Sequence, residues 1–141
     1  MTAPQPTDRR AKTVRLIHAA MVLGVLLFAV VAHFGLRPTM ADSGDLAPVM
    51  LRTLLAVAFG ACALSLVLRQ RVPQRSNDES VDLYWTRAAP PAMITWTPLE
   101  GASLLAVVLY SQTGAKIAMA VAAVVVALFV ALNPAYLEKR R

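Results

Sequence analysis

Four long apolar stretches follow one another along the chain, covering residues 16–36, 46–68, 91–112 and 117–137. Each is close to the length of about 20 residues that a helix needs to cross the hydrocarbon layer of a membrane. Backbone groups in that layer must pair with one another, and none of the stretches shows the alternation of a barrel strand. We therefore predict an all-α, polytopic membrane protein whose four transmembrane helices form two in-out-in hairpins, in one domain over residues 16–137.

Composition supports the same class of protein, because 57% of the 141 residues are hydrophobic and only 16% are charged. A soluble domain usually has about 45–50% apolar and about 25% charged residues. The net charge of +6 could indicate a nucleic-acid partner, but the placement of the charges along the chain indicates a membrane orientation instead.

The basic residues gather on one side of the predicted membrane. Four lie in the N-terminal tail (residues 1–15), four in the connection between the second and third spans, and three in the C-terminal tail (residues 138–141). The positive-inside rule places these eleven of the 14 Lys and Arg residues in the cytoplasm. The sequence thus predicts a bacterial inner-membrane protein with both termini cytoplasmic, a mobile cytoplasmic loop at residues 70–86, and no nucleic-acid partner.

Glu100 is the one charged residue of the third span, where a carboxylate is costly unless it has a partner. Two interpretations are open. The stretch 97–100 (TPLE) matches a helix start, with Thr97 as the N-cap and Glu100 closing a capping box. Alternatively, the helix begins near Pro91 and is kinked at Pro98. We favour the second interpretation, because a helix that started at Pro98 would be too short to cross the membrane.

Polar residues of neighbouring spans could complete a site around this carboxylate. Arg15 and His18 are three residues apart on one face of the first span, and Asn133 lies near the corresponding end of the fourth. The candidate intramembrane polar cluster is therefore Arg15, His18, Glu100 and Asn133. We expect Glu100 to pair with Arg15 or His18. Arg15 is favoured because it stays charged and can bind a carboxylate through two hydrogen bonds.

The two histidines, His18 and His33, both lie in the first span, about 22 Å apart along a helix. Histidines on membrane helices suggest haem ligands, but ligation by two histidines needs a second helix that also carries one. The other spans contain no histidine, so a second copy of the chain or a methionine would have to complete the site. We therefore predict no haem or other cofactor, no metal site and no catalytic residue.

Small residues spaced four apart let helix backbones approach closely where lipid supplies no hydrophobic drive. Such pairs occur in the first three spans: Ala20 with Gly24, Ala56 with Gly60, and Ala102 with Ala106. Packing within one chain is the favoured interpretation, over a seam between two copies. Gly114, a natural helix stop, should end the third helix and start a tight turn into the fourth.

One stretch carries a resemblance to known proteins. Residues 99–104 (LEGASL), continued through Tyr110 to Gly114 and combined with the histidine-bearing first span, resemble small bacterial four-helix inner-membrane proteins of unassigned function. The resemblance covers mainly the third helix. It implies the same four-helix architecture, and it implies no substrate, cofactor or catalytic residue.

The chain has little mass outside the predicted membrane and carries no catalytic signature. The sequence therefore predicts a non-enzymatic structural or accessory subunit of a larger membrane complex, in contact with the lipid bilayer and with other membrane subunits or with itself. One alternative is a small transporter or proton-conducting element that uses Glu100. A further alternative is a haem- or quinone-binding redox subunit that uses His18 or His33.

Overall fold

The computed structural model describes residues 9–35 and 46–139, and within these residues the chain is helical with no strand. The elements are α1 (Arg9–Phe34), α2 (Leu46–Leu68), the short 3-10 helix η1 (Arg69–Arg71), α3 (Val81–Thr113), α4 (Lys116–Ala131) and α5 (Pro134–Lys139). Among them α1, α2 and α3 are long and apolar enough to cross a membrane, and α4 is a shorter apolar helix. The predicted all-helical fold, with helices long and apolar enough to cross a membrane, is therefore confirmed. The first predicted connection, residues 37–45, and parts of both tails lie outside the described residues.

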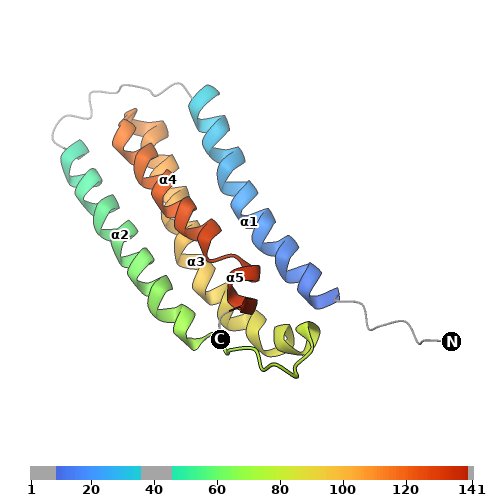
Figure 1. The fold of residues 1–141 in the computed structure, drawn as a ribbon. Helices are drawn as coiled ribbons and strands as arrows, with labels where there is room; N and C mark the ends of the chain where they lie inside the picture. Colours follow the sequence, from blue (N-terminus) through green and yellow to red (C-terminus); the bar gives the residue numbers. More distant parts are fainter. Residues whose placement is uncertain (1–8, 36–45, 140–141) are drawn as a thin grey trace.

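α3 is the centre of the bundle, and α1, α2 and α4 each pack mainly against it. α1 and α2 lie on either side of the α3–α4 pair, so the first two spans contact α3 more than each other (Figure 1). One end of the bundle holds the start of α1, the connection 72–80 and α5 (Figure 1). We call it the basic end, after the arginine and lysine residues of these segments. The opposite end, with the turn from α3 to α4, is called the turn end.

α3 begins at Val81, earlier than the apolar pattern predicted. Its N-cap is Ser80, whose Oγ accepts a hydrogen bond from the backbone N–H of Leu83 at 3.3 Å. The prediction of a mobile loop over residues 70–86 is therefore wrong in its extent, since only residues 72–80 connect η1 to α3. With 33 residues α3 is about 50 Å long, so it extends well beyond a hydrocarbon layer of about 30 Å.

α3 continues as one helix through the prolines in its middle. Pro98 lies inside it, and Thr97 Oγ1 donates a hydrogen bond to the carbonyl of Met93 at 3.0 Å. Thr97 is thus an interior residue, so the capping-box interpretation is wrong and the interpretation of a helix that passes through Pro98 is confirmed. The predicted stop at Gly114 is also confirmed. This glycine has a left-handed φ of 67°, and its N–H donates to the carbonyl of Tyr110 at 2.8 Å.

The fourth span is interrupted, whereas the sequence predicted one helix over residues 117–137. α4 ends at Ala131 and α5 begins at Pro134. Proline has no N–H to continue the helical hydrogen bonds, and it disfavours helical geometry in the residue before it. That residue, Asn133, caps α5, because its Oδ1 accepts a hydrogen bond from the N–H of Tyr136 at 2.9 Å. α4 alone is about 24 Å long, shorter than the hydrocarbon layer.

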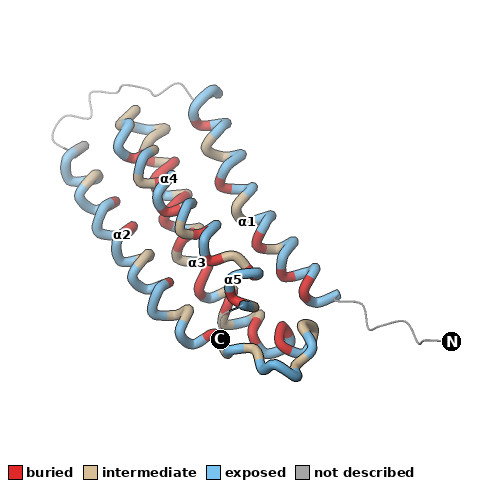
Figure 2. The backbone as a smooth tube through the Cα atoms, in the orientation of Figure 1, coloured by how far each residue is buried: buried red, intermediate tan, exposed pale blue. Residues whose placement is uncertain are grey.

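Burial is concentrated on α3 (Figure 2). Half of its most apolar 18-residue window is buried (50%), against 17% of the corresponding windows of α1 and α2. The buried face of α3 places Tyr84, Trp85 and Trp96 toward the basic end, and small residues such as Ala102 and Ala106 toward the turn end. α3 is therefore the core helix, while α1 and α2 direct most of their apolar surface outward.

The small-residue pairs divide in the same way. Ala106 of the third span is fully buried, so this pair is used for packing inside the chain as predicted. Both pairs of α1 and α2 are exposed, and a Cβ atom added at Gly24 or Gly60 would meet nothing within 4 Å. For these two helices, the interpretation that small residues pack within one chain is wrong.

Candidate functional site

A carboxylate at the basic end joins three helices. Arg15 of α1 donates from Nη2 to both Glu138 oxygens, at 2.9 Å to Oε1 and 2.8 Å to Oε2. Trp85 of α3 donates from Nε1 to Glu138 Oε1 at 2.8 Å. The Glu138 side chain is only 11% exposed, whereas that of Arg15 is 52% exposed. Glu138 of α5 is thus the partner of Arg15, and the prediction that Arg15 pairs with Glu100 is wrong.

His18 is bound to the last turn of α4. Its Nε2 lies 3.2 Å from the carbonyl oxygen of Phe129, and its ring makes edge contacts with Trp96 and Phe129, with centroids 4.7 Å and 5.0 Å away. The side chain is buried. These contacts occupy His18 inside the chain, so the alternative prediction that it pairs with Glu100 is also wrong.

Two further side chains of α3 bind carbonyl groups near the break between α4 and α5. Trp96 donates from Nε1 to the carbonyl of Leu132 at 2.8 Å, and the Tyr84 hydroxyl donates to the carbonyl of Leu137 at 3.2 Å. The last carbonyl groups of a helix have no partner within that helix, and an unpaired carbonyl away from water is costly. The aromatic residues of α3, together with His18, therefore make the interruption of the fourth span possible in an apolar setting.

Asn133 has a structural role at the same break. Besides capping α5, it donates from Nδ2 to the carbonyl of Val130 at 3.0 Å. Three members of the predicted cluster, Arg15, His18 and Asn133, thus contact the last turn of α4 or α5 through separate partners. They form no single site around a common ligand.

Glu100, the fourth member, stands apart from these contacts. It is half-buried on α3, and it makes no hydrogen bond or ion pair with any residue of the described ranges 9–35 and 46–139. Thr97, three residues before it on the helix, is exposed, and so are Gly101 and Leu105, which follow Thr97 at intervals of four along an adjacent side of α3. Adding a Cβ atom at Gly101 would meet nothing within 4 Å, so the surface beside Glu100 is open. The carboxylate therefore borders the outside of the bundle.

His33 lies near the turn end, far from His18 along α1. Its Nδ1 is 2.8 Å from the Tyr110 hydroxyl oxygen, and the two rings stack with centroids 6.0 Å apart. An iron bound at Nε2 of His18 would have to displace the Phe129 carbonyl. In the described part of the chain, no group of three or more His, Cys, Asp or Glu side chains is arranged to hold a metal ion.

Sequence reasoning missed the aromatic and carboxylate partners that organise the basic end. Tyr84 and Trp85 are residue types that are common at a membrane boundary, and Glu138 is a lone acid beside three basic residues in the tail. A signal was available, because a buried tryptophan or tyrosine usually finds a partner for its polar atom. The identity of that partner depends on which helix ends meet.

Comparison with known proteins adds no family assignment. No protein-family model matches the chain, and no curated protein or solved structure is significantly similar to it. The resemblance to small bacterial four-helix membrane proteins therefore stays a prediction.

Proposed function

We propose that this chain is a non-enzymatic accessory subunit of a bacterial inner-membrane complex, and that it binds its partner through the surface of α3 around Glu100. In this proposal α1 to α4 cross the membrane as two in-out-in hairpins, and the basic end faces the cytoplasm. α5 then lies at the level of the cytoplasmic headgroups, which explains why an α4 of about 24 Å suffices for the fourth crossing.

The observation that carries the proposal is the position of Glu100. Counted from Thr113 at the turn end, Glu100 lies about 20 Å along α3, and so about 10 Å inside the other face of a 30 Å layer. A charged side chain costs about 2.5–3.5 kcal/mol at the centre of a membrane helix and less nearer its ends, so Glu100 is stabilised by a partner or a proton. No cation of the described residues forms an ion pair with Glu100, so a cation from another chain would balance its charge.

The surface around Glu100 suits a second helix. The exposed positions of Thr97, Gly101 and Leu105 succeed one another along one side of α3, and Gly101 offers close backbone approach. The partner we expect is therefore a transmembrane helix with a lysine or arginine at the depth of Glu100. The exposed small-residue pairs of α1 and α2 leave room for further contacts in the same complex.

Site-specific photo-crosslinking tests the location of the partner. We expect a photo-reactive residue in place of Gly101 to form a discrete adduct with one membrane protein in intact cells, because this position is open. The matched control places the same residue at Val124 of α4, which is 68% exposed on another helix. Equal adducts from both positions, or none from position 101, would contradict docking at this surface.

The charge of Glu100 gives a second, independent test. Glu100→Gln should reduce the position-101 adduct at least about tenfold, which corresponds to a loss of about 1.4 kcal/mol in binding. Glu100→Asp should retain a substantial part of the adduct, because it keeps the charge. The melting temperature in detergent should stay the same in both variants, since Glu100 has no partner among the described residues. An adduct that is insensitive to Glu100→Gln would refute the role of this carboxylate.

The proton-conducting alternative predicts a different result from the same variant. An unpaired carboxylate that takes up a proton could conduct protons without any partner. Purified protein in liposomes would then support a proton flux that Glu100→Gln abolishes. We expect no such flux, and its appearance would replace the accessory-subunit proposal with the conductor.

The orientation makes a separate prediction. Reporter fusions in the connection at residue 77 and at the C-terminus should both report a cytoplasmic location, because eleven of the 14 basic residues lie in the three segments concerned. A fusion at the turn between α3 and α4 should report the periplasm. A periplasmic signal from either of the first two fusions would reverse or break the proposed topology.

A further inference from the structure

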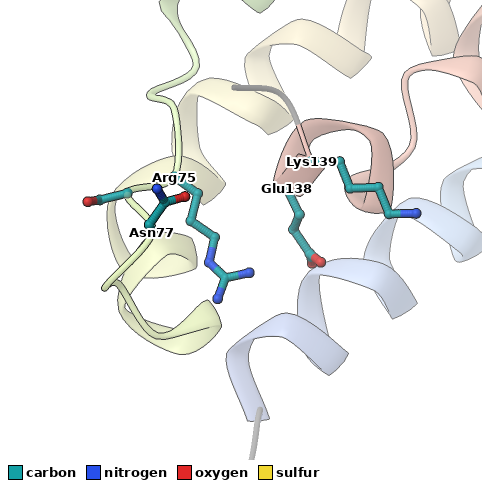
Figure 3. Close-up of a pocket in the computed structure, with 5 residues that line it drawn as sticks. Arg75, Asn77, Glu138 and Lys139 are labelled. Carbon is teal, nitrogen blue, oxygen red and sulfur yellow. The ribbon is translucent and has the colours of Figure 1, made fainter.

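A polar cavity lies at the basic end, between the connection 72–80 and α5 (Figure 3). Its volume is about 430 Å³, and it is lined by Arg75, Ser76, Asn77, Glu138 and Lys139. Figure 3 shows the Arg75 side chain directed from the connection toward α5, with Glu138 opposite it and the Lys139 side chain directed away beyond Glu138. The cavity is far from Glu100 and takes no part in the proposed docking surface.

The connection that carries Arg75 is held in place by an ion pair. Arg87 binds the Glu79 carboxylate through two hydrogen bonds, from Nε at 2.9 Å and from Nη2 at 2.7 Å. The hydrogen bond from Arg87 holds the pKa of the Glu79 carboxyl below its usual range, so this carboxylate stays charged at neutral pH. Arg75 in turn donates from Nε to the backbone carbonyl of Glu79 at 3.0 Å. This bond fixes the guanidinium at the cavity wall and occupies only its Nε, although the Glu79 carboxylate also attracts its charge.

The charge of the cavity is positive. Glu138 is the acid among its lining residues, and its two oxygens already accept hydrogen bonds from Arg15 and Trp85. Lys139 makes no hydrogen bond or ion pair with any residue that the structure describes. Among the residues that the structure describes, the cations that line the cavity are Arg75 and Lys139, and Ser76 and Asn77 add uncharged polar groups.

We infer that this cavity binds a phosphate group. Guanidinium and ammonium groups are the usual donors to phosphate oxygens, and the cavity is lined by one residue of each kind, Arg75 and Lys139. Basic cavities at the cytoplasmic side of membrane proteins commonly bind the headgroups of anionic lipids, and the orientation proposed above places α5 at the level of the cytoplasmic headgroups. The source of the phosphate is then an anionic phospholipid, with a free phosphate ion as the second possible source of the same chemistry.

Lipid binding by the full-length protein in detergent tests this inference without reference to Glu100 or to membrane orientation. Native mass spectrometry should show phosphatidylglycerol bound more tightly than diacylglycerol, which carries no phosphate. Lys139→Gln should weaken phosphatidylglycerol binding about fivefold, since one basic residue near a membrane surface contributes about this factor. Arg75→Gln should do the same or more. The matched control is Arg71→Gln, which removes an exposed cation at the same end that does not line the cavity.

The outcomes separate the sources and can overturn the inference. A selective loss in the two cavity variants, with no competition from millimolar inorganic phosphate, assigns the cavity to a lipid headgroup. Competition by inorganic phosphate with the same dependence on Lys139 assigns it to free phosphate. If Arg71→Gln weakens binding as much as Lys139→Gln, or if phosphatidylglycerol and diacylglycerol bind equally, the cavity is not a phosphate site. Lys139→Gln removes no contact described within the fold, so loss of folding does not confuse the result.

Discussion

Replacing Trp96 with alanine should lower the free energy of unfolding by about 3–5 kcal/mol, the range measured for deletion of a buried aromatic side chain. Trp96 is fully buried, contacts the ring of His18, and donates its indole N–H to the Leu132 carbonyl where the fourth span is interrupted. The variant therefore loses packing and also leaves a helix-terminal carbonyl without a donor. Thermal or denaturant unfolding in detergent, followed by circular dichroism, measures the effect.

Two controls separate packing from hydrogen bonding. Trp96→Phe keeps an aromatic ring and removes the indole N–H, so it should cost about 1–3 kcal/mol, the penalty for an unpaired buried polar group. Leu23→Ala removes a side chain of α1 that is 54% exposed and should have a much smaller effect. If Trp96→Ala destabilises the protein no more than Leu23→Ala does, Trp96 does not support the break between α4 and α5.

Replacing Glu138 with alanine should cost about 2–4 kcal/mol. About 1 kcal/mol of this is the ion pair with Arg15, a modest value because the arginine is half-exposed. The remainder comes from the Trp85 indole N–H, which loses its acceptor in a residue that is 1% exposed. Glu138→Gln keeps an acceptor for Trp85, so its cost should fall to about 1 kcal/mol. Equal costs for the alanine and glutamine variants would show that the indole contact contributes nothing.

A double-mutant cycle assigns the partner of Arg15. Arg15→Met combined with Glu138→Gln should show a coupling energy of about 1 kcal/mol, because the two residues contact each other. Arg15→Met combined with Glu100→Gln should be additive, since Arg15 is already bound to Glu138 and Glu100 contacts neither. Coupling between Arg15 and Glu100 would overturn the pairing described here. The two cycles share one variant, so differences in detergent or expression cancel.

The basic end shows how a correct chemical expectation was attached to the wrong residue. Arg15 was expected to bind a carboxylate through two hydrogen bonds, and it does so, with Glu138 in place of Glu100. The depth of Glu100 in the third span suggested the pairing, but depth along separate helices does not determine which ends meet. The early start of α3 and the break at Pro134 together bring α5 beside α1 and Trp85.

The sequence by itself determined the class of the protein, because a membrane-crossing helix depends on a local property, about 20 apolar residues that satisfy their own backbone. It also determined the stop at Gly114, where a left-handed φ is available to glycine without steric cost. Local signals also marked two features that the apolar pattern did not predict. The serine that caps the start of α3, Ser80, lies in a polar stretch, and the proline at the break between α4 and α5, Pro134, lies in an apolar one.

Only the tertiary structure decided which polar groups meet. Arg15 binds a residue of α5 that is 123 positions away in the sequence, and His18 binds a residue of α4 that is 111 positions away. Trp96 binds the carbonyl of Leu132, which lies 36 positions away between α4 and α5. Their contacts depend on α3 being the central helix and on α4 ending early, and neither follows from hydropathy, which records the length and polarity of each span separately. The same dependence leaves Glu100 beside the open surface at Gly101, because the cations of the described chain are held elsewhere or lie too far away.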